Sequence, residues 1–221
     1  MIKGSIFSGF SDDEYNELLR QLDHVAISLE NDEILVSEGD EVEHFYIVTK
    51  GRLKASRLFY SGNVNIIAFF HEGDCVFLDI ANTSLKTSPY DVRSIGKSEL
   101  IGFRNLSVFD NNISEVFMKR LISAMLRELA NDNIRKLFKM DVLYRKSLRE
   151  RIAMFFSFMS EKSGSLRFEI NMNRDEFAQY LGCNRSSLSH ELSLMRQDGI
   201  INFRKGNIEI TDKKKLMSII D

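Results

Sequence analysis

The stretch NRDEFAQYLGCNRSSLSHELSLMRQDGIINFRKGNIEITD, residues 173–212, determines the fold of the C-terminal part of the chain. Asn173 can cap a first helix, and Glu176, three residues later, completes a capping box. Gly182 then serves as a turn residue, because glycine adopts a positive φ at little cost. Asn184 can cap a second helix. The pattern therefore predicts two short helices that meet at a glycine corner.

The apolar positions of this stretch predict how the two helices pack. Ala178 is small where the helices would cross, and Leu188 would hold the second helix against the first. This spacing around Gly182 is typical of a helix-turn-helix. The following INFRKGNIEITD predicts a β-hairpin that turns at residues 205–207, which makes the unit a winged helix-turn-helix. An ordinary helical hairpin that does not bind nucleic acid is the alternative.

A recognition helix presents polar side chains near its N-terminus to the major groove of DNA. Arg185 suits guanine, because its guanidinium donates to both O6 and N7. A surface arginine that meets a phosphate, and a solvated His190, are the alternatives for these two residues. The predicted DNA contacts are Asn173, Arg174, Asn184, Arg185, Ser186, Ser187, Ser189, His190, Arg204 and Lys205.

Residues 33–109 have the pattern of a β domain. Strand-like runs such as FYIVT, RLKASRL, VNIIAFF, YDVRSI and ELIGF are separated by turn residues every eight to twelve positions. Such spacing is typical of a β-sandwich, roll or barrel. The SGN at 61–63 predicts a hairpin, and Ser11 with Glu14 predicts a capped helix before the strands. We expect a separate N-terminal β domain.

Residues 112–139 contain no Gly or Pro, and their apolar residues recur at helical spacing. Such a helix spans roughly 40 Å, and its apolar surface is wider than one stripe. We expect it to pair with its twin in a dimer and to end near Asp141; the alternative is a helix lying on its own domain. Heptad spacing does not continue beyond Leu129, which argues against a long independent coiled coil. The predicted dimer contacts are Phe117, Met118, Leu121, Ile122, Met125 and Leu129.

Composition narrows the class of protein. Of the 221 residues, 43% are hydrophobic and 28% are charged, which suits a packed domain. The chain has no apolar run long enough for a membrane span and no secretory signal pattern. Its two cysteines, Cys75 and Cys183, are far apart. We therefore expect a cytoplasmic protein with no disulfide, no metal site and no partner membrane.

Charge is distributed unevenly along the chain. Residues 1–110 hold 10 Lys and Arg against 18 Asp and Glu, whereas residues 141–221 hold 14 against 11. Nucleic acid would repel the acidic front part and could approach the mildly basic rear part. The charge pattern is thus compatible with DNA binding at the C-terminal end.

Together these motifs resemble the CRP/FNR superfamily of bacterial transcription regulators. The winged helix-turn-helix stretch, FYIVTKGRLKAS followed by EGD, and the long helix all have counterparts in that family. The resemblance implies an α+β chain with a double-stranded, jelly-roll-like β-roll sensor domain over 1–110, a dimerisation helix over 111–140 and a winged helix-turn-helix over 141–221. It also implies a homodimer that binds a two-fold-symmetric site in double-stranded DNA, with RNA polymerase as a further partner.

The sequence departs from the family pattern in two places. Family members that read TGA-containing half-sites carry Glu where Ser186 stands and commonly Arg where His190 stands, so their operators are not carried over. Cyclic-nucleotide binders have a cradle glycine and an arginine for the phosphate. Here the two segments read CVFLDI and TSPYDV, and Asp79 would repel a phosphate. We therefore do not expect cAMP as the effector.

An unidentified small organic effector, or none, remains. The predicted pocket residues are Phe69, Phe77, Leu78, Ile80, Tyr90, Leu121 and Met125, with a plain β-roll core as the alternative. The leading function is an effector-responsive regulator of transcription that binds DNA as a dimer. The second is a ligand-binding β-roll module whose C-terminal domain makes protein contacts only. The sequence shows no nucleophile–base pair, so we expect neither an enzyme nor a resident cofactor.

Overall fold

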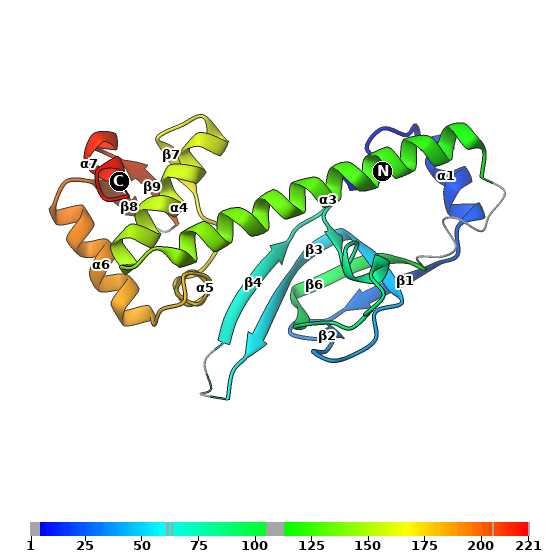
Figure 1. Ribbon diagram of the computed structural model, residues 1–221, viewed down its shortest axis with the longest axis horizontal. Helices are drawn as coiled ribbons and strands as arrows, with labels where there is room; N and C mark the ends of the chain where they lie inside the picture. The colour runs from blue at the N-terminus through cyan, green and yellow to red at the C-terminus, as the bar shows by residue number, and fades with distance from the viewer. Residues whose placement is uncertain (1–4, 61, 63, 105–112, 205, 221) are drawn as a thin grey trace. The chain divides into compact units, whose positions relative to one another are not determined.

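A computed structural model describes residues 5–60, 62, 64–104, 113–204 and 206–220 of the chain. The chain divides into two compact units, Met1–Ile134 and Arg135–Asp221. Each unit has its own cluster of buried hydrophobic side chains. Figure 1 labels most of the helices and strands of both units.

The first unit begins with two short helical elements, η1 (Ser5–Phe7) and α1 (Asp12–Gln21). The capping box predicted for α1 is confirmed. The backbone N–H of Glu14 donates to Oγ of Ser11 at 3.3 Å, and the backbone N–H of Ser11 donates to Oε2 of Glu14 at 2.8 Å. These reciprocal bonds satisfy two N–H groups that a free helix start would leave without a partner.

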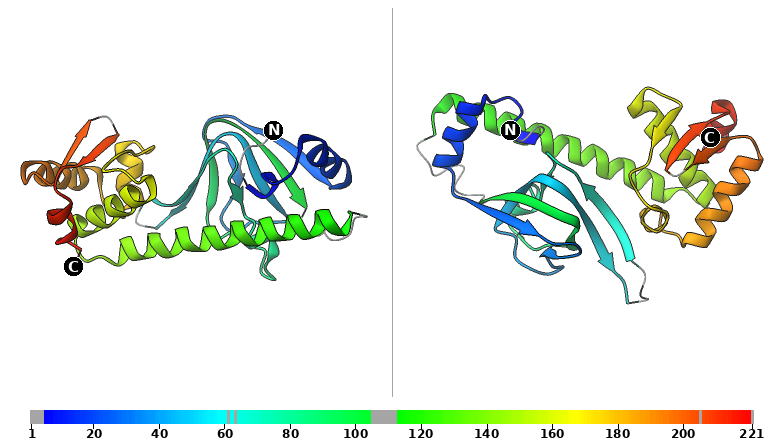
Figure 2. Two further views of the ribbon diagram at one scale, coloured as in Figure 1. Left: turned by 90° about the horizontal axis from the view of Figure 1, so that it is seen from above. Right: turned by 180° about the vertical axis from the view of Figure 1, so that it is seen from behind.

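The β-roll follows α1 and is antiparallel. Its strands are β1 (His24–Leu29), β2 (Ile34–Val36), β3 (His44–Leu58), β4 (Val64–Phe70), β5 (Cys75–Val76) and β6 (Asp91–Arg104). The main path of the sheet runs β1-β6-β3-β4, while β2 pairs with β6 and β5 with β3. Figure 2 shows these strands from two further sides. The β3–β4 pairing confirms the predicted hairpin, although residues 61 and 63 of its turn lie outside the described residues.

Two of the predicted strand breaks are wrong. FYIVT and RLKASRL form the single strand β3, and YDVRSI and ELIGF form the single strand β6. Gly51 and Gly96 have φ values of 86° and 72°, and the β3–β6 register shifts on either side of Lys50. Irregularities of this kind bend a strand without ending its pairing. The roll therefore consists of two long strands where the turn residues predicted four short ones.

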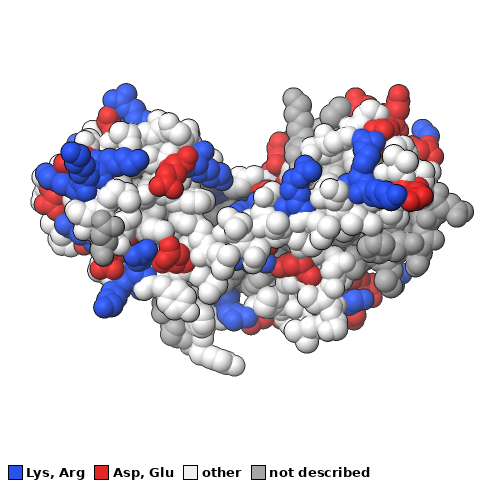
Figure 3. Space-filling model, turned by 45° about the horizontal axis from the view of Figure 1, so that its top comes forward, with Lys and Arg blue, Asp and Glu red and all other residues white. Residues whose placement is uncertain are grey.

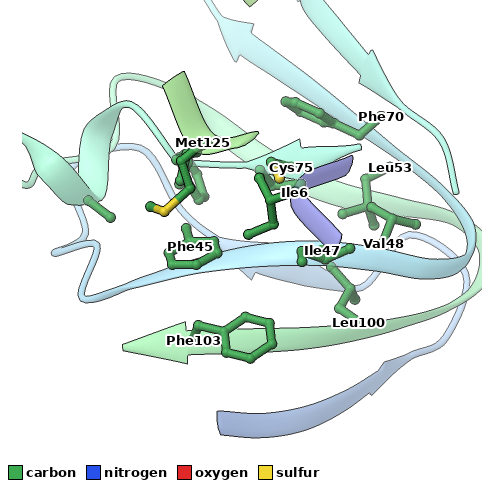
Figure 4. Packing of buried hydrophobic residues seen from close by; sticks show 14 of the residues in the cluster. Ile6, Phe45, Ile47, Val48, Leu53, Phe70, Cys75, Leu100, Phe103 and Met125 are labelled. Atoms are coloured by element: carbon green, nitrogen blue, oxygen red, sulfur yellow. The ribbon is translucent and has the colours of Figure 1, made fainter. Parts of the chain in front are cut away.

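The core of the first unit lies between the faces of the roll. Phe45 and Phe103 stack with their ring centroids 5.4 Å apart, and Ile47 and Leu53 are fully buried beside them. Figure 4 shows Met125, from the helix that follows the roll, directed toward Phe45. Full burial of each such side chain contributes about 1.5–3 kcal/mol to stability.

The long helix α3 (Glu115–Tyr144) continues past its predicted end near Asp141. Residue 112, where the prediction begins, lies outside the described residues. The helix does not break near Asp141 but runs on to Tyr144, and Oδ1 of Asp141 pairs with Nη2 of Arg145, just after the helix end, at 3.3 Å. Val142 is fully buried in the second unit's core, which also favours continuation of the helix.

The sequence assigns one apolar stripe of α3 to the dimer. In the structure this stripe packs against the chain's own roll. Leu121 and Met125 are buried in the core of the first unit, and Phe117, Met118 and Leu129 pack partly against it. Leu121 and Met125 are therefore unavailable to a second copy, which corrects the prediction for these two residues. A different set of large apolar side chains on α3 is exposed: Val116, Leu126, Ile134, Leu137, Met140 and Tyr144.

The predicted effector-pocket residues lie mostly in this same core. Phe77, Leu78, Leu121 and Met125 are buried, Ile80 in η2 (Ile80–Asn82) packs partly against the core, and Phe77 stacks on Tyr90 with centroids 5.8 Å apart. Phe69 does not join them. Side chains of a strand alternate between faces, so the burial of Phe70 turns Phe69 outward, where the Arg52 guanidinium lies 5.2 Å from its ring centroid.

The second unit is a winged helix-turn-helix, as predicted. Its elements after α3 are α4 (Leu148–Ser163), β7 (Arg167–Glu169), α5 (Arg174–Tyr180), α6 (Arg185–Gln197), β8 (Ile201–Arg204), β9 (Asn207–Ile210) and α7 (Lys213–Met217). The small sheet has the order β7-β9-β8. Phe156, Leu188 and Met195 are fully buried in its core, so α6 is held against α4 and α5.

Candidate nucleic-acid interface

The first helix of the motif, α5, begins as the sequence predicts. Oδ1 of Asn173 accepts hydrogen bonds from the backbone N–H groups of Asp175 and Glu176, both at 2.9 Å. The Glu176 carboxylate in turn accepts from the backbone N–H of Asn173 at 2.8 Å. The capping box is complete, so the start of α5 is fixed.

Gly182 forms the corner between the two helices. Its φ is 66°, and the backbone N–H of Cys183 donates to the carbonyl of Ala178 at 3.0 Å. This 6→1 hydrogen bond, with Gly182 in the left-handed region, is the Schellman motif that ends many helices. Glycine stands here because it adopts a positive φ at little cost. Nη1 of Arg151 on α4 also donates to the carbonyl of Leu181 at 3.1 Å, which holds the corner in place.

The second helix, α6, begins directly after the corner. Oδ1 of Asn184 accepts from the backbone N–H of Ser187 and from the hydroxyl of Ser186, both at 2.7 Å. The predicted cap is confirmed, and the Ser186 hydroxyl donates its proton to the capping side chain of Asn184. Leu188 and Leu192 on the inner side of α6 are fully buried.

The residues predicted to contact DNA lie on the outer side of the motif. Ser189 and Arg174 are half-buried, and Lys205 lies outside the described residues. The exposed members of the set are Asn173, Asn184, Arg185, Ser186, Ser187, His190 and Arg204. The structure thus brings the starts of α5 and α6 together on one accessible surface, as major-groove recognition requires.

Charged and aromatic contacts organise this surface, and the sequence analysis missed three of the residues involved. Nη1 of Arg185 lies 2.8 Å from Oδ2 of Asp175. The guanidinium of Arg174 lies 5.3 Å from the ring centroid of Phe203 on β8, and that of Arg196 lies 5.7 Å from the same ring. Asp175, Arg196 and Phe203 carry no local signal for these contacts, because each partner is at least seven positions away in the chain.

The environment of Arg174 shows that positive charge is concentrated here. Burial, and then the positive charge of Arg185, lower the pKa of Arg174. A guanidinium with a lowered pKa remains charged at neutral pH, so the two arginines repel each other. A phosphate placed between them would relieve that repulsion.

The rest of the second unit is also positively charged. Residues 135–221 contain 17 Lys and Arg against 11 Asp and Glu. Figure 3 shows Lys and Arg side chains of this unit interspersed with acidic ones on the face in view. Such a surface can attract a polyanion without forming one uninterrupted basic patch.

Other kinds of site lack support in the described part of the chain. No group of three His, Cys, Asp or Glu there could hold a metal ion. Both cysteines are free. Within the same residues, no helix combines the length and apolar character that crossing a membrane requires.

Comparison with known families matches both units. Residues 150–219 match the family described as Crp-like helix-turn-helix domain, and residues 26–110 match the cyclic nucleotide-binding domain. The first match covers α4 to α7, and the second covers most of the roll.

Curated relatives align over most of the chain. The transcriptional activator protein anr of Pseudomonas aeruginosa is 24% identical over 198 residues, which cover 86% of this chain and 78% of that protein. The CRP-like cAMP-activated global transcriptional regulator of Mycobacterium tuberculosis is 23% identical over 221 residues, covering 98% and 96%.

Solved structures share the fold. FixK2 from Bradyrhizobium japonicum superposes with a TM-score of 0.68 at 21% identity and covers 90% of this chain and 98% of its own. The c-di-GMP responsive global regulator CLP of Xanthomonas campestris gives a TM-score of 0.69 at 16% identity, with the same coverage. With both domains matched in the order that the motifs predict, the chain belongs to the CRP/FNR family of DNA-binding transcription regulators.

Proposed function

We propose that this protein binds a two-fold-symmetric DNA site as a homodimer, in the cytoplasm, and that α6 lies in the major groove. The observation that supports this most directly is the division of α6 into two sides. Leu188, Leu192 and Met195 are buried, while the polar residues of its first two turns are accessible. A helix held by one side on a rigid core can insert its other side into a groove without unfolding.

The residues divide into those that read bases and those that hold the backbone. Arg185, at the start of α6, reads guanine, and Ser186, Ser189 and His190 are the other base-facing positions. The backbone contacts come from the capped helix starts, from Arg174 and from the wing residues Arg204 and Lys205. Because the Ser189 hydroxyl can either donate or accept, and the Ser186 hydroxyl, which donates to Asn184, offers a base only an acceptor, we expect weaker discrimination at the positions that the two serines face.

The dimer is proposed from the exposed apolar side chains of α3. Leu126, Leu137, Met140 and Tyr144 are at least half exposed, and Ala130 completes spacings of four, seven, three and four residues between them. Steps of three and four, with one step of seven across the polar Asn133, follow a heptad pattern, which a second copy of the same helix would cover. On the exposed side of α3 the pattern therefore continues beyond Leu129, contrary to the expectation from the sequence. Of the residues predicted for this contact, Ile122 is half-buried and lies four residues before Leu126.

We also propose that the roll does not use a cyclic nucleotide. Tyr90 is half-buried and stacks on Phe77, and the negative charges of Asp79 and Asp132 add to desolvation in raising the pKa of Tyr90. A phosphate beside these two carboxylates would be repelled. An effector of the roll would then be a neutral organic molecule, and RNA polymerase is the proposed partner on DNA.

Selection of bound DNA from a random pool tests this function. We expect enrichment of an inverted repeat whose half-sites lie about 10 base pairs apart, because the recognition helices of a two-fold dimer are one DNA turn apart. Binding to the selected site should weaken steeply with salt. Failure to enrich any sequence, with a folded dimer, would contradict the proposal and favour a C-terminal domain that contacts proteins only.

A further inference from the structure

We propose that Asp175 is a specificity-determining residue, which positions Arg185 for its base and lowers the affinity of the surface for unrelated DNA. This inference rests on the proposed function. Its structural basis is the 2.8 Å contact between Nη1 of Arg185 and Oδ2 of Asp175, made between the first turns of α6 and α5. Both side chains are more than half exposed, so the pair lies on the surface that would face the duplex.

The contact uses only part of the arginine. A guanidinium has five N–H donors, and Nη1 supplies the one that reaches Asp175. Two further donors are enough for the bidentate bond to O6 and N7 of guanine. The carboxylate therefore limits the directions that the long arginine side chain can take and leaves its base-reading edge available. Less freedom is then lost when Arg185 binds the correct base.

Position in the helices explains why an acidic residue suits this place. Arg185 is the first residue of α6, where the helix dipole disfavours a positive charge. Asp175 is in the first turn of α5, where a negative charge is favoured, and its carboxylate offsets the unfavourable positive charge of Arg185. The pair is thus locally stable before any DNA is present.

The same carboxylate controls the net charge of the surface. Arg174 and Arg185 are close enough for the positive charge of Arg185 to lower the pKa of Arg174, and Asp175 forms an ion pair with Arg185. Without Asp175 the cluster would carry two positive charges beside the phosphates, and with it the net charge is one. Phosphate attraction is independent of sequence, so the carboxylate weakens nonspecific binding more than specific binding.

A double-mutant cycle on DNA binding tests the proposal. The affinity for DNA is measured for four proteins: the wild type, Asp175→Asn, Arg185→Ala and the double variant. Each protein is tested on the selected site and on unrelated DNA. The third DNA is the selected site altered at the base pair where Arg185→Ala loses discrimination. We expect Asp175→Asn to bind unrelated DNA up to about tenfold more tightly at 0.1 M salt, with a steeper salt dependence. Its discrimination at the altered base pair should fall about fivefold, and only when Arg185 is present.

Glu161→Gln provides the matched control, because it removes an exposed carboxylate from α4 of the same unit. It should change neither quantity. If Asp175→Asn raises the affinity for all DNA equally, or lowers discrimination equally without Arg185, the positioning role is refuted. If the wild type enriches no sequence, the proposed function fails and this inference with it. If the wild type enriches a sequence, and Asp175→Asn discriminates that sequence from other DNA as well as the wild type does, only this inference fails.

Discussion

Nε of Arg149 on α4 lies 2.5 Å from Oε1 of Glu191 on α6, and this ion pair ties α6 to α4. Nη1 of the same arginine reaches Oδ2 of Asp198 at 2.8 Å, just after the end of α6. Bonds to these two carboxylates raise the pKa of Arg149. One arginine therefore holds the middle and the end of α6 on the domain core.

Removal of Arg149 should loosen α6. The side chain of Glu191 is only 19% exposed, so Arg149→Met leaves a poorly solvated carboxylate without its partner. We expect a loss of about 1–3 kcal/mol in the free energy of unfolding, measured with denaturant. Glu191→Gln alone should cost less, and the pair should show coupling in a double-mutant cycle; purely additive effects would show that the contact contributes nothing.

Gly182→Ala should destabilise the second unit through the backbone alone. An added Cβ would lie 3.7 Å from its two nearest side-chain atoms, so there is room for it, but φ is +66°. The expected cost is about 1–2 kcal/mol, and Gly182→Asn should cost less because asparagine tolerates this region. Gly9→Ala, where the new Cβ meets nothing within 4 Å and φ is not in that range, should leave stability unchanged.

The stability of the second unit should depend on pH through Lys139. Its Nζ lies 3.3 Å from the ring centroid of Tyr180, a contact that favours the ammonium form, yet burial lowers the pKa of Lys139 from 10.5 to about 7. Between these two values the unfolded chain binds a proton that the folded chain does not. The free energy of unfolding therefore rises with pH across that window and is independent of this group below it.

Comparison with Lys139→Met isolates this contribution. Between pH 7 and 9.5, the wild type should gain roughly 1 kcal/mol of unfolding free energy per pH unit relative to the variant, in which nothing titrates at this position. Parallel pH profiles for the two proteins would show that Lys139 keeps its ordinary pKa.

Phe77 should be more sensitive to alanine than to glycine. Its ring is buried and its φ is 63°, a region that costs a non-glycine residue about 1–3 kcal/mol. Both substitutions remove the ring, at about 3–5 kcal/mol, but only Phe77→Gly relieves the backbone. We expect the glycine variant to be about 1 kcal/mol more stable than the alanine variant in denaturant unfolding. The reverse order would show that the backbone is unstrained.

Leu126→Lys should yield monomers in sedimentation equilibrium. Leu126 is 62% exposed at the N-terminal end of the proposed seam, where a lysine in the second copy would face it. Leu85→Lys makes the same change at an exposed residue of the roll and should leave the dimer intact. A Leu126→Lys protein that remains a dimer would place the contact elsewhere.

Local signals in the sequence were sufficient for the C-terminal motif. Three predicted features are confirmed: the cap at Asn173, the cap at Asn184 and the left-handed glycine at Gly182. Each of them depends on hydrogen bonds between residues no more than five positions apart. Capping and turn formation are local interactions, so their residue types identify them before any tertiary contact is known. The winged helix-turn-helix could therefore be predicted from the sequence alone.

Only the tertiary structure decided which face of α3 meets the roll. The helix carries apolar residues on both sides, and periodicity does not distinguish Leu121, which is buried, from Leu126, which is exposed. The same holds for Arg185 and Asp175, ten positions apart, whose contact exists because the corner brings two helix starts together. Sequence determined the elements because their signals are local; the choice of faces and the charge pairs depend on how those elements pack.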